Sequence, residues 1–78
     1  MTDTEKLNKA IDDAGIMISA IMKALKIKSY STIKAKINNK SEFTAGEITA
    51  LCDLLRLSKN QRDEIFFAEK TEFNSVSA

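Results

Sequence analysis

The sequence predicts an all-α fold, a compact five-helix domain that contains a helix–turn–helix. The 78 residues include no proline and only two glycines, which favours helices joined by short turns. Four segments place apolar residues at the i, i+3, i+4, i+7 spacing of a helix with one buried side. Three segments match the capping box that begins many helices. Together these patterns predict five short helices around one small core.

The first helix is expected at about residues 3–14. Residues 2–5 place a threonine three positions before a glutamate, so Thr2 is expected to cap the helix. Leu7 and Ile11 would face the core, and Gly15 is a suitable left-handed C-terminal stop.

The second helix is expected at about residues 17–26 and is unusually apolar. Its core-facing side chains are predicted to be Ile18, Ile21, Met22 and Leu25. Three further residues widen the apolar surface beyond what a small core normally uses, and we expect this flank to stay partly exposed as a partner-binding surface: Met17, Ala20 and Ala24. The alternative is that this flank packs against the first helix or the tail.

A four-residue turn should join this helix to a third one at about residues 29–38. Ser29 can cap its start, and Ile33 and Ile37 should point inward. Tyr30 is expected at the edge of the core with its hydroxyl in water, and a base-stacking platform is the less favoured alternative. Either Asn38 or the next asparagine could adopt a left-handed conformation at the end.

Two more capping boxes, at Thr44 and Ser58, predict helices at about residues 44–56 and 59–68. Leu51 should lie in the core, and Cys52 is interpreted as a buried side chain on the same stripe. The domain would thus cover residues 1–68, with a flexible polar tail at 69–78.

The charge of the chain is concentrated in its centre. Residues 14–41, called the basic segment below, hold six lysines and no acidic residue, although the net charge of the chain is only +1. Such a segment is suited to a polyanion, DNA above all. The lysines of the basic segment are Lys23, Lys26, Lys28, Lys34, Lys36 and Lys40.

A helix from residue 29 would turn Ser31 and Ala35 outward, with Lys34 and Lys36 on the two shoulders of that face. Small residues could then approach base edges in a major groove while the lysines reach phosphates. The candidate DNA-binding residues are Lys28, Ser29, Ser31, Thr32, Lys34, Ala35, Lys36, Asn38 and Lys40. A solvated lysine-rich surface is the alternative for each lysine taken singly.

Catalysis finds no support in the composition. With no histidine and one cysteine, the chain offers neither the usual base–nucleophile pair nor a zinc-binding set, so no enzyme activity, metal or cofactor is expected. It also has no apolar run of about 18 residues, which excludes a typical membrane span.

Residues 31–44, followed by Glu47-Ile48 and a leucine-rich helix, resemble small lambda-repressor-like helix–turn–helix proteins of temperate phages. The ending Ile65-Phe66-Phe67 is similar to the close of that domain. The resemblance covers about residues 4–68. Within it the chain looks like Cro-type regulators and like the antirepressor called modulator of repression. Lys26 departs from the pattern, because such turns usually carry glycine there.

The resemblance implies a regulator of the lysis–lysogeny decision in the cytoplasm of a bacterial host. The expected partner is the phage repressor, whose operator binding this chain would control. Direct binding of operator DNA, as in Cro, is the other mode. The candidate reading face lacks arginine and glutamine, the strongest base readers, so repressor binding is preferred slightly. The chain is expected to be a monomer or weak homodimer.

Overall fold

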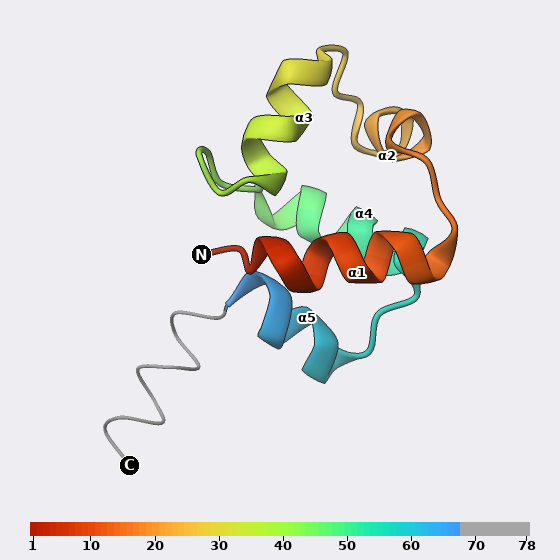
Figure 1. Ribbon diagram of the computed structural model, residues 1–78, viewed down its shortest axis with the longest axis vertical. Coiled ribbons are helices and arrows are strands. Elements are labelled where there is room, and N and C mark those ends of the chain that lie inside the picture. Colours follow the sequence, from red (N-terminus) through yellow and green to blue (C-terminus); the bar gives the residue numbers. More distant parts are fainter. Residues whose placement is uncertain (68–78) are drawn as a thin grey trace.

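A computed structural model describes residues 1–67, and this part of the chain is all-helical, without strands (Figure 1). The predicted fold class is therefore confirmed at the level of an all-α domain. Residue 68 and the tail expected at 69–78 lie outside the described residues. The helices are α1 (Thr4–Ala14), α2 (Ile18–Leu25), α3 (Tyr30–Ile37), α4 (Ala45–Leu55) and α5 (Lys59–Phe66).

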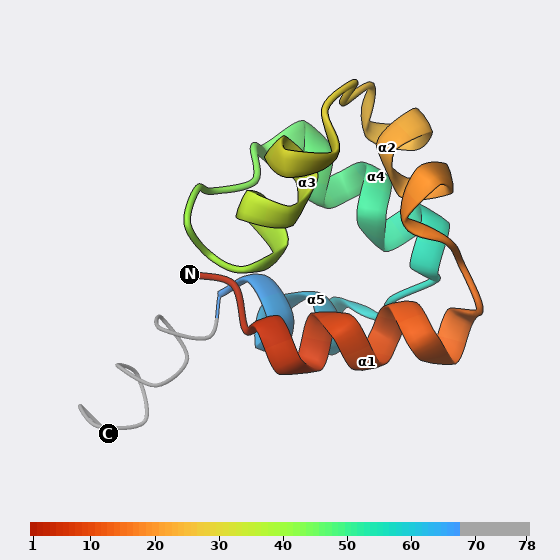
Figure 2. The same cartoon turned by 45° about the horizontal axis from the view of Figure 1, so that its top comes forward.

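Helix α4 lies at the centre of the fold and contacts α1, α2 and α5, while α1 also packs on α3 and α5. Figure 2 shows α1 and α5 along one side of the molecule and α2 and α3 on the other. All five helices contribute to one core, which lets so short a chain bury large aliphatic side chains completely. The buried core residues are Leu7, Ile11, Ile21, Leu25, Ile33, Ile37, Phe43, Leu51, Leu55, Ile65 and Phe66.

The capping boxes predicted at Thr44 and Ser58 are confirmed, since each hydroxyl accepts from the amide three residues on, and the amide of each cap residue donates to the side chain of that third residue. The box predicted at Thr2 is wrong. Asp3 is the N-cap of α1, and its carboxylate accepts from the amide of Lys6. Thr2 is instead buried, with 8% of its surface exposed, and its amide donates to the Asn39 side chain at 3.1 Å.

The first four residues are used to hold separate elements together. The amide of Asp3 donates to the carbonyl of Ile65 at 2.6 Å, and the hydroxyl of Thr4 donates to the carbonyl of Ile37 at 2.7 Å. These bonds join the start of α1 to the ends of α5 and α3. They also satisfy carbonyls that a helix C-terminus leaves without an intrahelical partner.

Residues in the left-handed backbone conformation follow the ends of several helices. Gly15 has φ +67° and stops α1 as predicted, and Asn39 has φ +64° in the loop after α3. Two basic residues adopt the same conformation without being glycine, Lys26 after α2 with φ +60° and Arg56 after α4 with φ +55°. Here a Cβ atom crowds the backbone, so both positions carry a small conformational cost.

Candidate nucleic-acid interface

The basic segment contains α2, a four-residue connection at 26–29, α3 and the start of the loop that follows α3. In both ribbon views this connection and the start of α3 form the end of the molecule farthest from α5 (Figures 1 and 2). Ser29 occupies the N-cap position of α3, but its side chain makes no capping bond. Its hydroxyl instead lies 2.9 Å from that of Ser31. The first turn of α3 therefore presents free backbone amides beside exposed hydroxyls, a polar surface suited to phosphate.

Five of the six lysines in the basic segment remain available to a partner. Four of them are exposed and Lys34 is half-buried. None of the five pairs with a carboxylate among residues 1–67. Their positive charge is thus not neutralised locally within the described chain, which is the electrostatic condition for binding a polyanion. The exposed four are Lys23, Lys26, Lys28 and Lys40.

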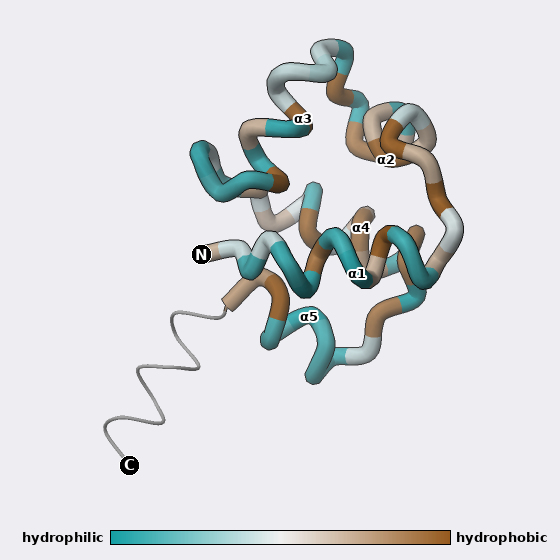
Figure 3. The backbone as a smooth tube through the Cα atoms, viewed as in Figure 1, coloured by the Kyte–Doolittle hydropathy of each residue, from teal (hydrophilic) through white to brown (hydrophobic). Residues whose placement is uncertain are grey.

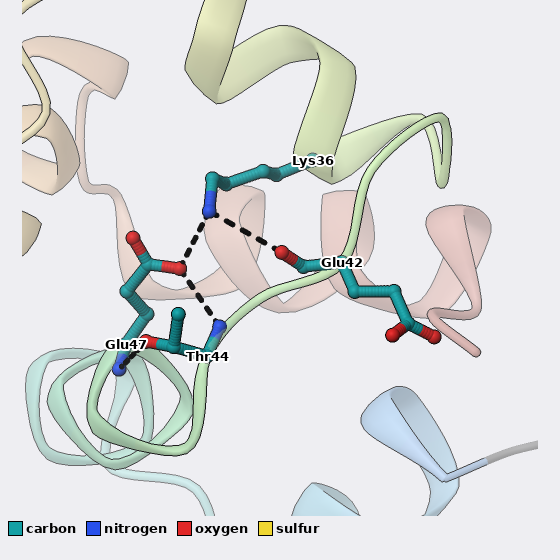
Figure 4. A network of polar contacts seen from close by, with 4 residues as sticks. All are labelled: Lys36, Glu42, Thr44 and Glu47. Carbon is teal, nitrogen blue, oxygen red and sulfur yellow. Dashed lines mark hydrogen bonds and ion pairs between the residues drawn. The ribbon is translucent and has the colours of Figure 1, made fainter.

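The sixth lysine corrects the sequence-based site. Lys36 was expected on the outward shoulder of α3, but its Nζ lies 2.8 Å from Oε1 of Glu47, and only 14% of its side chain is exposed. Figure 4 shows the ammonium group donating to Glu47 and to the carbonyl of Glu42, at 3.2 Å. Lys36 thus connects α3 to the start of α4 and is unavailable to a phosphate.

The pKa of Glu47 depends on the same contacts. Burial of its carboxylate by itself would raise the pKa, but the Lys36 ammonium and hydrogen bonds from Thr44 outweigh burial and hold the pKa below its ordinary value. The carboxylate is therefore ionised and paired at neutral pH. One oxygen accepts both from Lys36 and from the Thr44 amide, at 2.9 Å, so capping of α4 and pairing with α3 depend on one side chain.

The outward surface of α3 lies nearer its N-terminus than predicted. Ser31 and Thr32 are exposed, whereas Ala35 is half-buried. The loop after α3 folds back, and the amides of Lys40 and Ser41 donate to the carbonyl of Ala35 at 2.8 and 3.3 Å. These bonds hold the loop at the C-terminal end of α3, whereas the first turn of the helix projects (Figure 1).

Asn38 also remains accessible. It is exposed at the C-cap of α3. Lys28 and Ser29 precede the helix and are both exposed. The candidate DNA-binding residues whose side chains are exposed therefore lie at both ends of α3, and most of them lie at its start.

Tyr30 is a residue whose placement the sequence analysis missed. It was expected at the core edge, but 61% of it is exposed. Tyr30 is the first residue of α3. The spacing of three and four residues places Ile33 and Ile37 in the core. The same spacing does not bury Tyr30, because the start of α3 projects beyond the neighbouring helices. The signal that could have located it is its position directly after the N-cap, where a side chain often faces solvent.

The apolar flank of α2 is exposed as the sequence predicted. Met17 is 73% exposed, and Ala20 and Ala24 are exposed as well. The flank is smaller than the hydropathy of this helix suggests (Figure 3), because three other apolar residues around it are half-buried against the core. These are Ile16, Ile18 and Met22.

Neither Cys52 nor the possible metal ligands among residues 1–67 form a second functional site. Cys52 is half-buried on α4, and burial raises the pKa of its thiol, which leaves it protonated and unreactive at neutral pH. Residues 1–67 contain no cluster of three histidine, cysteine or acidic side chains that could hold a metal ion. None of the helices in this part of the chain is long and apolar enough to cross a membrane.

Comparison of the chain with protein-family models, with curated proteins and with solved structures found no match.

Proposed function

We propose that this chain is a small helix–turn–helix transcription regulator that binds duplex DNA through the basic segment. The observation that carries the proposal is the set of five basic-segment lysines that form no ion pair within residues 1–67. Two of them, Lys26 and Lys28, lie in the connection that leads to the projecting start of α3. A phosphate backbone is the partner that this charge pattern fits best. The resemblance to lambda-repressor-like phage proteins supports the same function, in the cytoplasm of the bacterial host and in the choice between lysis and lysogeny.

The residues divide into two roles. Lys26, Lys28 and Lys34 are placed to contact phosphates and position the domain. Ser31 and Thr32 can donate to or accept from base edges, and Asn38 can pair with adenine if α3 lies in the major groove. Short hydroxyl side chains discriminate bases weakly, so specificity should be modest for a single domain.

Salt dependence tests this proposal. The logarithm of affinity for a labelled duplex should fall with the logarithm of salt concentration at a slope of about −3 to −5 per monomer. Lys34→Ala should weaken binding to every sequence and flatten the slope by about one. Lys59→Ala is the matched control, because Lys59 is exposed at the start of α5, outside the basic segment. Affinity that is independent of salt would exclude the proposal.

Binding to the phage repressor is the second candidate function. It is favoured by the exposed flank of α2, where Met17 is the most exposed large apolar side chain among the described residues. Exposed apolar surface beside lysines is a combination found at specific protein interfaces. In this mode the domain would act as an antirepressor, or modulator, by controlling repressor access to the operator. The two modes can coexist in one protein.

A gel-shift experiment separates the two modes. Operator-region DNA is mixed with this protein, with the repressor of the same phage, and with both. A specific shift by this protein alone supports direct DNA binding, whereas a change in the repressor's shift supports the partner mode. Met17→Glu and Ala20→Glu should abolish only an effect on the repressor. Ala45→Glu, at an exposed position of α4, is the control. Normal repressor binding by both flank variants would exclude α2 as the partner surface.

A further inference from the structure

We propose that Tyr30 is a DNA-contacting residue whose aromatic ring packs against the edge of the groove that receives α3. This inference rests on the proposed DNA-binding function and adds an apolar contact to it. The observation is an aromatic side chain, 61% exposed, on the first turn of the projecting helix. No hydrogen bond within the described residues holds its hydroxyl.

The surroundings of Tyr30 indicate what kind of partner covers it. Lys28 precedes it by two residues in the turn, and Lys34 follows at i+4, on the same side of α3. The exposed Ser31 and Thr32 adjoin it, and no acidic residue lies between positions 14 and 41. An apolar ring at the centre of lysines and hydroxyls fits a partner that has phosphates around a stack of bases.

The chemistry of tyrosine suits both parts of such a partner. The ring can pack on a thymine methyl or a deoxyribose, and the hydroxyl can donate to a phosphate oxygen. An acidic protein surface could also satisfy the lysines. Duplex DNA accounts in addition for the exposed hydroxyls and free amides at the start of α3, because all of these groups donate to phosphate.

The proposed Tyr30 contact should affect the salt dependence of binding differently from a lysine contact. Removal of the ring takes away apolar burial without changing the number of neutralised phosphates. Tyr30→Ala should therefore weaken binding of a fluorescein-labelled duplex by about tenfold, the scale expected for one partly buried aromatic ring, and leave the salt slope unchanged. Lys28→Ala should instead flatten the slope by about one. Tyr30→Phe keeps the ring and should retain most of the affinity.

Fluorescence anisotropy at several salt concentrations measures these quantities, and thermal unfolding checks that Tyr30→Ala remains folded, as expected for an exposed residue. If the wild-type protein binds the duplex but Tyr30→Ala binds equally well, or if its loss appears only in the salt slope, the ring contact is wrong and the proposed function stands. If the wild-type protein shows no salt-dependent binding, the proposed function itself fails. Loss of repressor binding by Tyr30→Ala, with DNA binding intact, would assign the ring to a protein contact and overturn the inference.

Discussion

At the scale of single residues, the pair formed by Lys36 and Glu47 shows how one contact removes a lysine from the candidate site and gives it a structural role. Both side chains are largely buried, with 14% and 16% exposed. A charge in that position is stable only while its partner is present, because an unpaired charge would lose hydration without compensation. The pair therefore fixes the end of α3 against the start of α4, on either side of a polar loop.

We expect Glu47→Gln to lower the free energy of unfolding by about 1.5–3 kcal/mol at neutral pH, the range for a hydrogen bond to a charged group. Glutamine retains the capping geometry, so the loss isolates the charge. The folded-state pKa of Glu47 lies below its unfolded value near 4.5. Its contribution is therefore fully present above about pH 4.5 and is lost as the pH falls through the folded pKa.

Urea denaturation of the wild type and of Glu47→Gln, at neutral pH and at acid pH, measures this effect. The difference between the two proteins should shrink with acidification. A double-mutant cycle with Lys36→Met, which keeps the apolar stem of the lysine, should show strong coupling. Equal stability of all four proteins would show that the pair is without structural effect.

At the scale of elements, the connection between α2 and α3 combines a conformational cost with a charge. Lys26 ends α2 at φ +60°, a conformation that glycine adopts without strain. A left-handed residue with a Cβ persists only when the surroundings hold it, and such positions are often functional. In this chain the side chain kept at that cost is a lysine in the turn proposed to contact phosphate.

Lys26→Gly should therefore separate stability from binding. Relief of the left-handed conformation should raise the free energy of unfolding by about 0.5–1 kcal/mol, even after the greater freedom of glycine in the unfolded chain. DNA affinity should fall at the same time. Arg56→Gly is the matched control, because Arg56 ends α4 at φ +55° outside the basic segment. It should change stability similarly and leave DNA binding intact. Parallel thermal unfolding and gel shifts test both; equal binding by both variants would remove Lys26 from the interface.

At the scale of the whole molecule, charge and core are arranged around α4. The acidic pairs Asp12-Asp13 and Asp63-Glu64 belong to α1 and α5, where Asp13 and Asp63 form ion pairs with Lys9 and Arg62. The net charge of +1 conceals the six lysines of the basic segment, which has no acidic residue and contains α2 and α3. Such a distribution should orient the start of α3 toward a polyanion during approach.

The single core makes stability depend on its central residue. Leu51 on α4 is 1% exposed, and Leu51→Ala should lower the free energy of unfolding by about 2–5 kcal/mol. A domain of this size has little stability in reserve, so this change removes a large part of it. Thr49→Ala, at an exposed site on the same helix, should change it by less than about 0.5 kcal/mol. Chemical denaturation measures both, and a near-zero effect of Leu51→Ala would contradict a core centred on α4.

The local sequence by itself determined the all-α class, the approximate helices and most of the core, because apolar spacing and capping act within one or two turns. Ile33 and Ile37, the boxes at Thr44 and Ser58, and the stop at Gly15 all follow from neighbours close in sequence. The concentration of lysines was equally visible. These features need no knowledge of which helix packs on which.

Only the tertiary structure decided which of those residues remain available. Lys36 pairs with Glu47 across a loop, and Thr2 does not cap α1 but donates its amide to the Asn39 side chain. The chain after α3 folds back so that its amides donate to the carbonyl of Ala35. Tyr30 becomes exposed because the end of α3 projects past the helices that cover the rest of it. Each of these outcomes depends on groups brought together from distant positions or on a neighbour's edge, and helical periodicity contains no information about either.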